Sequence, residues 1–132
     1  MAWVAVTTEA SVKPRKPRKK KASGDCYQAA ANYMMDQCLY GGNKHLVLVH
    51  GEVCGQGPLS GVTYGHAWVE DGDTVIDLSN GRNLRVLKVV YYAIGGVSHL
   101  NNTHRYTWDE AKVMLLTRKV YGPWELQTAT GL

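Results

Sequence analysis

The chain has 132 residues, enough for one domain with a single modest core, and an apolar content of 45% that favours folding over disorder. Fourteen Gly residues favour turns and short strands over a helical bundle. No apolar run approaches the roughly 20 residues of a membrane span, and the N-terminus lacks a secretory signal pattern. With an odd number of cysteines, three, we expect a cytoplasmic protein with reduced thiols.

The net charge of +4 belongs to one segment near the N-terminus. Residues 13–21 hold seven of the fifteen basic residues, so the rest of the chain has eight basic against eleven acidic residues, a balance of −3. This balance argues against a basic nucleic-acid groove on the folded body. Like charges and two Pro predict a disordered basic arm over residues 1–22. Alternatively, the arm binds nucleic acid or another polyanion electrostatically.

A helix is expected near the start of the single domain, which we place at residues 23–132. Asp25 is a good helix N-cap, and residues 26–39 are rich in Ala and Met, with apolar side chains at a helical period. Residues 41–43, Gly-Gly-Asn, are typical of a helix end.

Three β-patterned runs follow the helix. Residues 46–53 are rich in β-branched side chains and predict a buried strand, and the Gly-rich residues 55–61 predict a loop. Residues 62–70 and 73–78 are two further strands. Between them, Asp71-Gly72 is a strong hairpin signal.

The remaining chain predicts one more strand and one more helix. The apolar run 84–94 indicates a strand, and residues 107–119 indicate a short helix with Thr107 as its cap. Residues 122–124 are expected to end the ordered part. The order of elements predicts an α+β domain, with the first helix packed on a mainly antiparallel sheet.

The hairpin predicts a contact between a histidine and a carboxylate. If Asp71-Gly72 form the two-residue loop, His66 lies directly opposite Asp77 on the same face, with Cβ atoms roughly 4.5–5.5 Å apart. A four-residue loop over 70–73 keeps this register, whereas a three-residue loop would separate the two side chains. Such a carboxylate would fix the tautomer of the imidazole and stabilise its protonated form.

Cys26 is the natural third member of this group. It lies in the first turn of the predicted helix, where unpaired N–H groups and the helix dipole stabilise a thiolate. A nearby imidazole would make it a working nucleophile, and the backbone N–H of Cys26 would supply one oxyanion donor. Gln28 and Gln56 are candidates for a second donor. Taken alone, a helical Cys is more often a small core residue.

Residues 24–30, 65–70 and 75–79 carry a resemblance to a known family. A Cys at a helix start, a His-Ala-Trp sequence on one strand and an Asp on the next are similar to the core of transglutaminase-like proteins of the papain-like superfamily of thiol enzymes. The resemblance implies a papain-like core with peptidase, amidase or transglutaminase-like activity and no cofactor. By position, the nucleophile, the histidine and the orienting carboxylate are matched by Cys26, His66 and Asp77.

Short segments over most of the chain also resemble small uncharacterised proteins encoded by tailed phages. The segments are residues 49–53, 65–70, 79–82, 91–92 and 122–124. This resemblance brings no established activity. It would place the protein in the host cytoplasm.

Other side chains are candidates for substrate binding rather than chemistry. His50 ends an apolar strand and is expected either in the core or in the cleft near His66. The cleft is slightly favoured, because Gly51 beside it would let a substrate backbone approach closely. Trp68 shares a face with His66 and is expected to shield it. Gln28 and Arg82 complete the set, with Arg82 a candidate for holding an anionic group or simply a solvated surface residue.

Zinc binding is a weaker alternative, because the Cys and His residues lack the close spacing of zinc motifs. Cys26 and Cys38 would lie about 18 Å apart along one helix.

Three functions remain open. These are a thiol hydrolase or acyltransferase with a peptide or protein substrate, a non-catalytic phage-type protein that binds a host protein, and nucleic-acid association through the basic arm.

Overall fold

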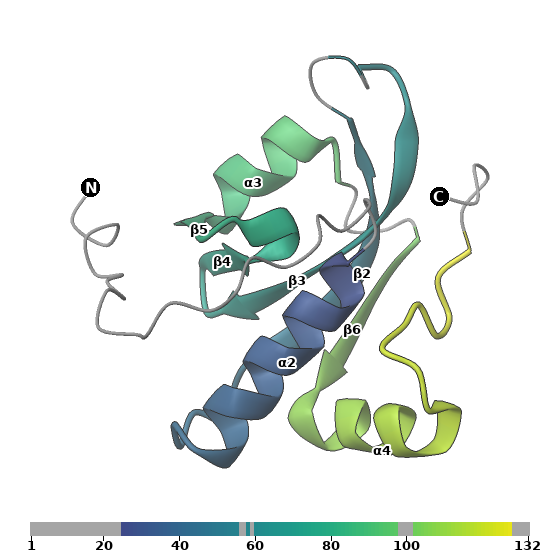
Figure 1. The fold of residues 1–132 in the computed structure, drawn as a ribbon. Helices are drawn as coiled ribbons and strands as arrows, with labels where there is room; N and C mark the ends of the chain where they lie inside the picture. The colour runs from purple at the N-terminus through teal and green to yellow at the C-terminus, as the bar shows by residue number, and fades with distance from the viewer. Residues whose placement is uncertain (1–24, 56–57, 59, 98–101, 128–132) are drawn as a thin grey trace, which may run out of the picture.

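The computed structural model describes residues 25–55, 58, 60–97 and 102–127 (Figure 1). The basic arm predicted over residues 1–22 lies outside this part of the chain. Across the described ranges, no helix has both the length and the apolar character to cross a membrane.

The described residues form an α+β domain built on one antiparallel sheet. The sheet has five strands in the order β5-β4-β3-β2-β6, and all neighbouring strands are antiparallel. The predicted fold class is therefore confirmed at this level. In chain order the elements are α2 (Cys26–Leu39), β2 (Val47–Cys54), β3 (Thr63–Asp71), β4 (Thr74–Asp77), the 3-10 turn η2 (Ser79–Gly81), β5 (Leu84–Leu87), α3 (Lys88–Gly95), β6 (Thr103–Thr107) and α4 (Trp108–Arg118).

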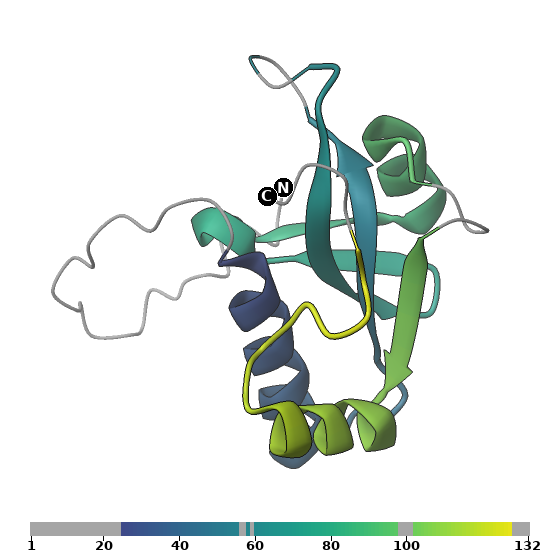
Figure 2. The same ribbon diagram turned by 90° about the vertical axis from the view of Figure 1, so that its right-hand side faces the viewer.

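Helices cover both faces of the sheet. Figure 2 shows α2 and α4 on one side and α3 on the other. Under α2, the apolar side chains that recur at a helical period, Met34 among them, meet the alternate strand residues Leu48, Ala67 and Val69. The face under α3 holds a smaller cluster around Trp68. The sheet is thus covered on both sides, which explains why β2 and β3 are buried along most of their length.

The β3–β4 hairpin forms with a register two residues away from the predicted one. Asp71 pairs with Thr74, so the loop residues are Gly72 and Asp73, not Asp71 and Gly72. Gly72 has a φ of 63° at the first loop position, which suits the tight hairpin turns that need positive φ there. A shift of two residues keeps every side chain on its expected face.

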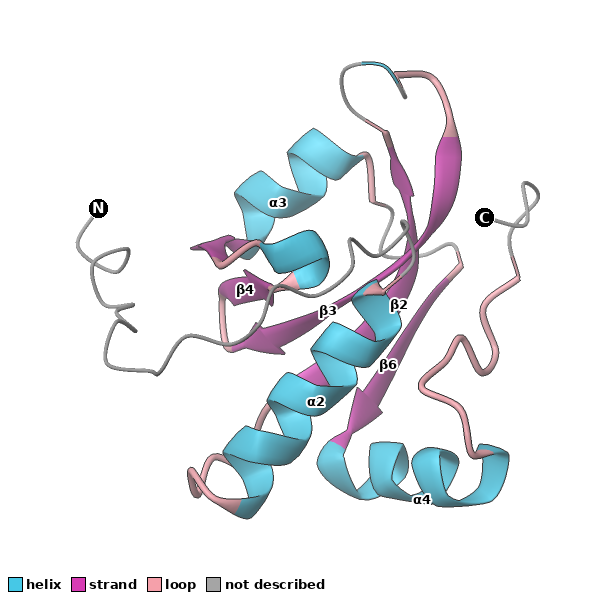
Figure 3. Ribbon diagram, viewed as in Figure 1, coloured by secondary structure: helices cyan, strands magenta, loops and turns pink. Residues whose placement is uncertain are grey.

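The predicted strand over residues 84–94 is wrong beyond Leu87. There the chain turns into helix α3, which carries Tyr91 and Tyr92 (Figure 3). In a strand two successive side chains would point to opposite faces, whereas in a helix both can reach the sheet. Tyr91 indeed donates to Asp77 and Tyr92 donates to Glu70. The tertiary contacts of these hydroxyls override the β propensity of the run.

The edge strand β6 was not expected from the sequence. Its residues, Thr-His-Arg-Tyr-Thr, contain few apolar side chains, because it pairs only with β2. Helix α4 follows as predicted, and Thr107 forms a reciprocal capping box with Glu110. After α4 the chain continues in an ordered form to residue 127, past the predicted end, with Trp124 and Leu126 buried.

His50 on β2 is fully buried in an aromatic cluster on the α2 side of the sheet. Its ring centroid lies 5.0 Å from that of Tyr27, 5.1 Å from Tyr106 and 4.9 Å from Trp124. Neither ring nitrogen has a hydrogen-bond partner among the described residues. Burial, with a smaller effect of nearby His104, lowers the pKa of His50 to about 3. The fold therefore holds His50 as a neutral aromatic ring.

This burial predicts a pH dependence of stability. The folded pKa of His50 lies below its unfolded value near 6.5, so the unfolded chain binds the extra proton and stability falls as the pH drops from 6.5 towards 3. We expect His50→Leu to remove this loss. The free energy of unfolding of His50→Leu minus that of wild type should be about 1–3 kcal/mol larger at pH 4 than at pH 7.5. Urea unfolding of both proteins over this pH range measures the difference. Parallel stability curves would contradict the assignment.

Candidate active site

A buried histidine–carboxylate pair lies at the end of the β3–β4 hairpin. Nε2 of His66 is 2.9 Å from Oδ2 of Asp77, and both side chains are almost fully buried. Continuing the observed register places Asp77 opposite Trp68, so His66 meets Asp77 as a diagonal neighbour. The predicted contact is present, although the predicted direct opposition is wrong. Diagonal side chains of this length reach each other across the sheet face.

Asp77 is surrounded by donors. Its Oδ1 accepts hydrogen bonds from the backbone N–H of Ser79 at 2.9 Å and the Ser79 hydroxyl at 2.6 Å. Its Oδ2 accepts from the Tyr91 hydroxyl at 2.7 Å, in addition to the contact with His66. Burial raises the pKa of Asp77, but the hydrogen bonds and charge of His66 and the bonds from Ser79 outweigh it and lower the pKa well below its ordinary value. Asp77 is therefore a fixed negative charge.

Cys26 completes the group from the start of α2. Its side chain is 3% exposed and forms a hydrogen bond with the His66 ring. Because Nε2 of His66 is engaged by Asp77, Nδ1 is the ring nitrogen left for the thiol. The first turn of α2 contains no acidic residue that would oppose a negative charge on the sulfur.

The electrostatics of His66 follow from these two partners. Burial lowers the pKa of His66, but the hydrogen bonds to Asp77 and Cys26, together with their charges, outweigh burial and raise the pKa to about 9. His66 is then an imidazolium at neutral pH. The Cys26 sulfur therefore lies beside a positively charged ring.

Asp25 links the start of α2 to the turn that follows Asp77. It occupies the predicted N-cap position, but its side chain makes no cap hydrogen bond. Instead its carboxylate accepts from the backbone N–H of Asn80 at 3.0 Å. Asn80 has a φ of 54°, and its backbone lies next to Ser79, which binds Asp77. This hydrogen bond holds the Cys26 end of the helix against the Asp77 side of the hairpin.

Cys26, His66 and Asp77 line a cavity of about 460 Å³, a size typical of ligand sites. Arg82 lies in its wall and is also exposed, so the structure agrees with both alternatives, an anion-binding residue and a solvated surface residue. The described residues that line it are Cys26, Tyr27, Val53, Cys54, Tyr64, Gly65, His66, Asp77, Asn80, Arg82, Leu84, Val86, Val90, Tyr91, Ile94 and Gly95.

The other predicted substrate-binding residues lie elsewhere. His50 belongs to the aromatic core cluster and does not reach the cavity, which corrects the cleft position favoured from the sequence. Gln28 on α2 is also absent from the lining, and Gln56 lies outside the described residues. The role expected for Gly51 differs too, because a Cβ there would lie 2.9 Å from the Trp68 ring, so Gly51 makes room for Trp68 and not for a ligand.

Trp68 packs beside His66, with ring centroids 6.1 Å apart, and is completely buried. The shielding role predicted from the shared face is consistent with this position. However, Trp68 is not part of the cavity wall, and its Nε1–H donates to Glu70 at 3.0 Å. Trp68 therefore supports the histidine from within the core.

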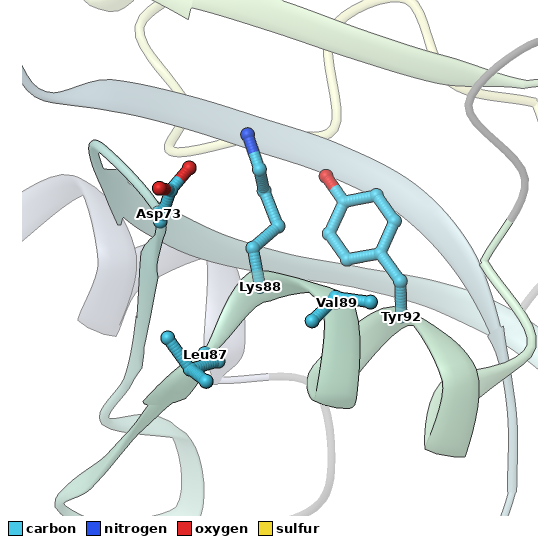
Figure 4. Close-up of a pocket in the computed structure, with 5 residues that line it drawn as sticks. All are labelled: Asp73, Leu87, Lys88, Val89 and Tyr92. Atoms are coloured by element: carbon cyan, nitrogen blue, oxygen red, sulfur yellow. The ribbon is translucent and has the colours of Figure 1, made fainter.

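Glu70 anchors α3 on the far side of Trp68. Its buried carboxylate accepts from Tyr92 and from Arg105 at 3.0 Å, and Lys88 Nζ lies 3.6 Å away. Figure 4 shows Lys88 and Tyr92 extending from α3 beside a second cavity of about 400 Å³. The described part of its wall contains no Cys, Ser, Thr or His, and we assign it no chemistry. Through Tyr91 and Tyr92, α3 is tied to both buried carboxylates.

The described residues contain no group of three or more His, Cys, Asp or Glu side chains that could hold a metal ion. Comparisons with protein-family models, with curated proteins and with solved structures found no match to this chain. The geometry of the site is therefore the basis on which a function can be assigned to this chain.

The buried pair predicts a second pH dependence, opposite in sign to that of His50. The folded pKa of His66 lies above its unfolded value, so its contribution to stability is complete below about pH 6.5 and is lost as the pH rises through about 9. Asp77→Asn removes the negative charge and the charge-assisted hydrogen bond that raise the pKa of His66. We expect the stability difference between wild type and this variant to be about 1–3 kcal/mol larger at pH 6 than at pH 9.5, by urea unfolding. A difference that does not change with pH would refute the assignment.

The Asp25 link predicts a local change in amide exchange. Without the carboxylate, the Asn80 N–H loses its acceptor, so Asp25→Ala should speed hydrogen exchange at Asn80 at least five-fold. The global cost should be about 0.5–1.5 kcal/mol. Asp36→Ala, which removes an exposed carboxylate from the same helix, is the matched control and should leave exchange at Asn80 unchanged. Equal exchange in both variants would show that the link does not hold the turn.

Proposed function

We propose that this chain is a thiol-dependent hydrolase or acyltransferase that acts on an amide bond, with a papain-like arrangement of its core. Cys26 is the nucleophile, His66 the base and Asp77 the carboxylate that orients the base. The observation that carries the proposal is that the His66 ring contacts both the Cys26 thiol and the buried Asp77 carboxylate, at the wall of a cavity.

The residues suit a two-step acyl transfer. His66 carries the proton at the outset, and the Cys26 sulfur attacks the carbonyl carbon as a thiolate, forming a C–S bond. The C–N bond of the amide then breaks, and the leaving amine takes the proton from His66. Water or a second amine next attacks the thioester, giving a proton to His66. The C–S bond breaks, the sulfur leaves as a thiolate, and His66 keeps the proton, which restores the starting state.

Two features of the site stabilise the charges that the reaction needs, the imidazolium of His66 and the oxyanion on the substrate. Asp77 stays ionised and stabilises the imidazolium, because Ser79 and Tyr91 donate to it throughout. The backbone N–H of Cys26, in the first turn of α2, is one donor for the oxyanion. Among the polar residues in the cavity wall, Asn80 and Tyr64 are candidates for the second donor.

The test is the alkylation of Cys26 by iodoacetamide, which needs no knowledge of the substrate. Cys54 lines the same cavity and Cys38 is a third thiol, so the measurement is made in a background with Cys38→Ser and Cys54→Ser. Loss of the imidazolium should slow alkylation at pH 7 at least ten-fold in His66→Ala.

His45→Ala is the matched control for this test. The His45 side chain is 70% exposed, is paired with Asp71, and does not line the cavity. Its loss should leave the alkylation rate unchanged, and circular dichroism checks that both variants fold. A Cys26 that reacts equally in all three proteins would refute the coupled Cys–His pair and with it the proposed chemistry.

A further inference from the structure

The cavity continues from the reactive end into an apolar region. Val53 contributes from β2, Leu84 and Val86 from β5, and Val90 and Ile94 from α3. Leu84 and Val86 are two apart on a strand, and Val90 and Ile94 are four apart on a helix. Each pair therefore presents one face. Three elements thus direct apolar side chains into the same cavity that holds Cys26.

Part of this apolar wall is open to water. Val90 is 43% exposed and Ile94 is 60% exposed, although both belong to the lining of a concave site. Apolar surface in a cavity beside a nucleophile gains stability when an apolar ligand group covers it. Single exposed apolar residues are common on protein surfaces, but here they share one cavity with the proposed nucleophile.

The charges in the wall exclude one class of ligand. Among the described residues of the lining, Asp77 is the one acidic residue, and its carboxylate is already bound by His66, Ser79 and Tyr91. Arg82, a basic residue, also lines the cavity. A cationic ligand group would therefore meet positive charge and no available carboxylate.

We infer that the acyl group transferred to Cys26 is an uncharged apolar one, aliphatic or aromatic, seated against Val86, Val90 and Ile94. This inference rests on the proposed function and adds the substrate class to it. The thioester formed on Cys26 would place its carbonyl carbon next to His66 and its apolar side chain along α3. Amides of Lys or Arg residues would be poor acyl donors.

The test compares p-nitrophenyl esters of N-acetylalanine, N-acetylnorleucine and N-acetyllysine with the full chain. Norleucine and lysine side chains are similar in length and differ chiefly in the charged end group. Norleucine adds three methylenes to alanine, so we expect kcat/KM to be at least ten-fold higher for the norleucine ester than for the alanine ester. The kcat/KM for the norleucine ester should also be at least ten-fold higher than the kcat/KM for the lysine ester. Turnover by Cys26→Ala is subtracted as the background.

Two substitutions on α3 locate the effect. Ile94→Asp places a charge in the apolar wall and should lower the norleucine-to-alanine ratio of kcat/KM about ten-fold. Val89→Asp is the matched control, since Val89 is 71% exposed on the same helix but does not line this cavity. It should leave the ratio within two-fold. Equal ratios in the two variants would overturn the assignment of the wall.

The outcomes separate the two proposals. Turnover that depends on Cys26 but is the same for all three esters would overturn the apolar acyl site and leave the thiol chemistry standing. Turnover that is unchanged in Cys26→Ala would overturn the thiol chemistry, and the acyl site with it.

Discussion

The hydrogen bond between His66 and Asp77 is the interaction on which the rest of the site depends. Both groups are almost fully buried, and a buried charge is costly unless it is paired and hydrogen-bonded. The fold meets this condition with donors from Ser79 and Tyr91. The turn after β4 supplies Ser79 and helix α3 supplies Tyr91, so both elements lie where they stabilise the ionised carboxylate of Asp77.

The two buried histidines show how environment selects the protonation state of one residue type. His50 and Gly51 are consecutive on β2, and Gly51 pairs with His66, so the two imidazoles lie close together on opposite sides of the sheet. His50 is enclosed by aromatic rings and stays neutral, whereas His66 meets a carboxylate and a thiol and takes a proton. Their partners, and not the depth of burial, decide the difference.

Sequence reasoning reached the parts of this structure that depend on local pattern. The helix over residues 26–39 and the two strands of the hairpin follow from spacing and propensity, and the shared face of His66 and Asp77 survived an error of two residues in register. The helix α3 could not be predicted in the same way. Its apolar sequence favours a strand, whereas the contacts that accompany its helical form, from Tyr91 and Tyr92 to carboxylates on the sheet, are tertiary ones.

The contributions of Asp25 and Tyr91 could not have been found from spacing. Asp25 has the residue type and position of a helix cap, yet its partner is a backbone N–H 55 residues away. Tyr91 lies within the apolar run that the sequence predicts to be a strand, and its partner Asp77 is 14 residues away on a different element. A signal for either would need the positions of the elements in space, which composition and periodicity do not contain.

The long reach of the Asp25–Asn80 hydrogen bond has a consequence for folding. The hairpin that holds His66 and Asp77 is local and can form early, but Cys26 joins it only when α2 docks across a large sequence separation. A partly folded chain would therefore hold His66 against Asp77 before Cys26 reaches them. If Cys26 is the nucleophile proposed above, its activation by His66 would come only when the whole domain is assembled.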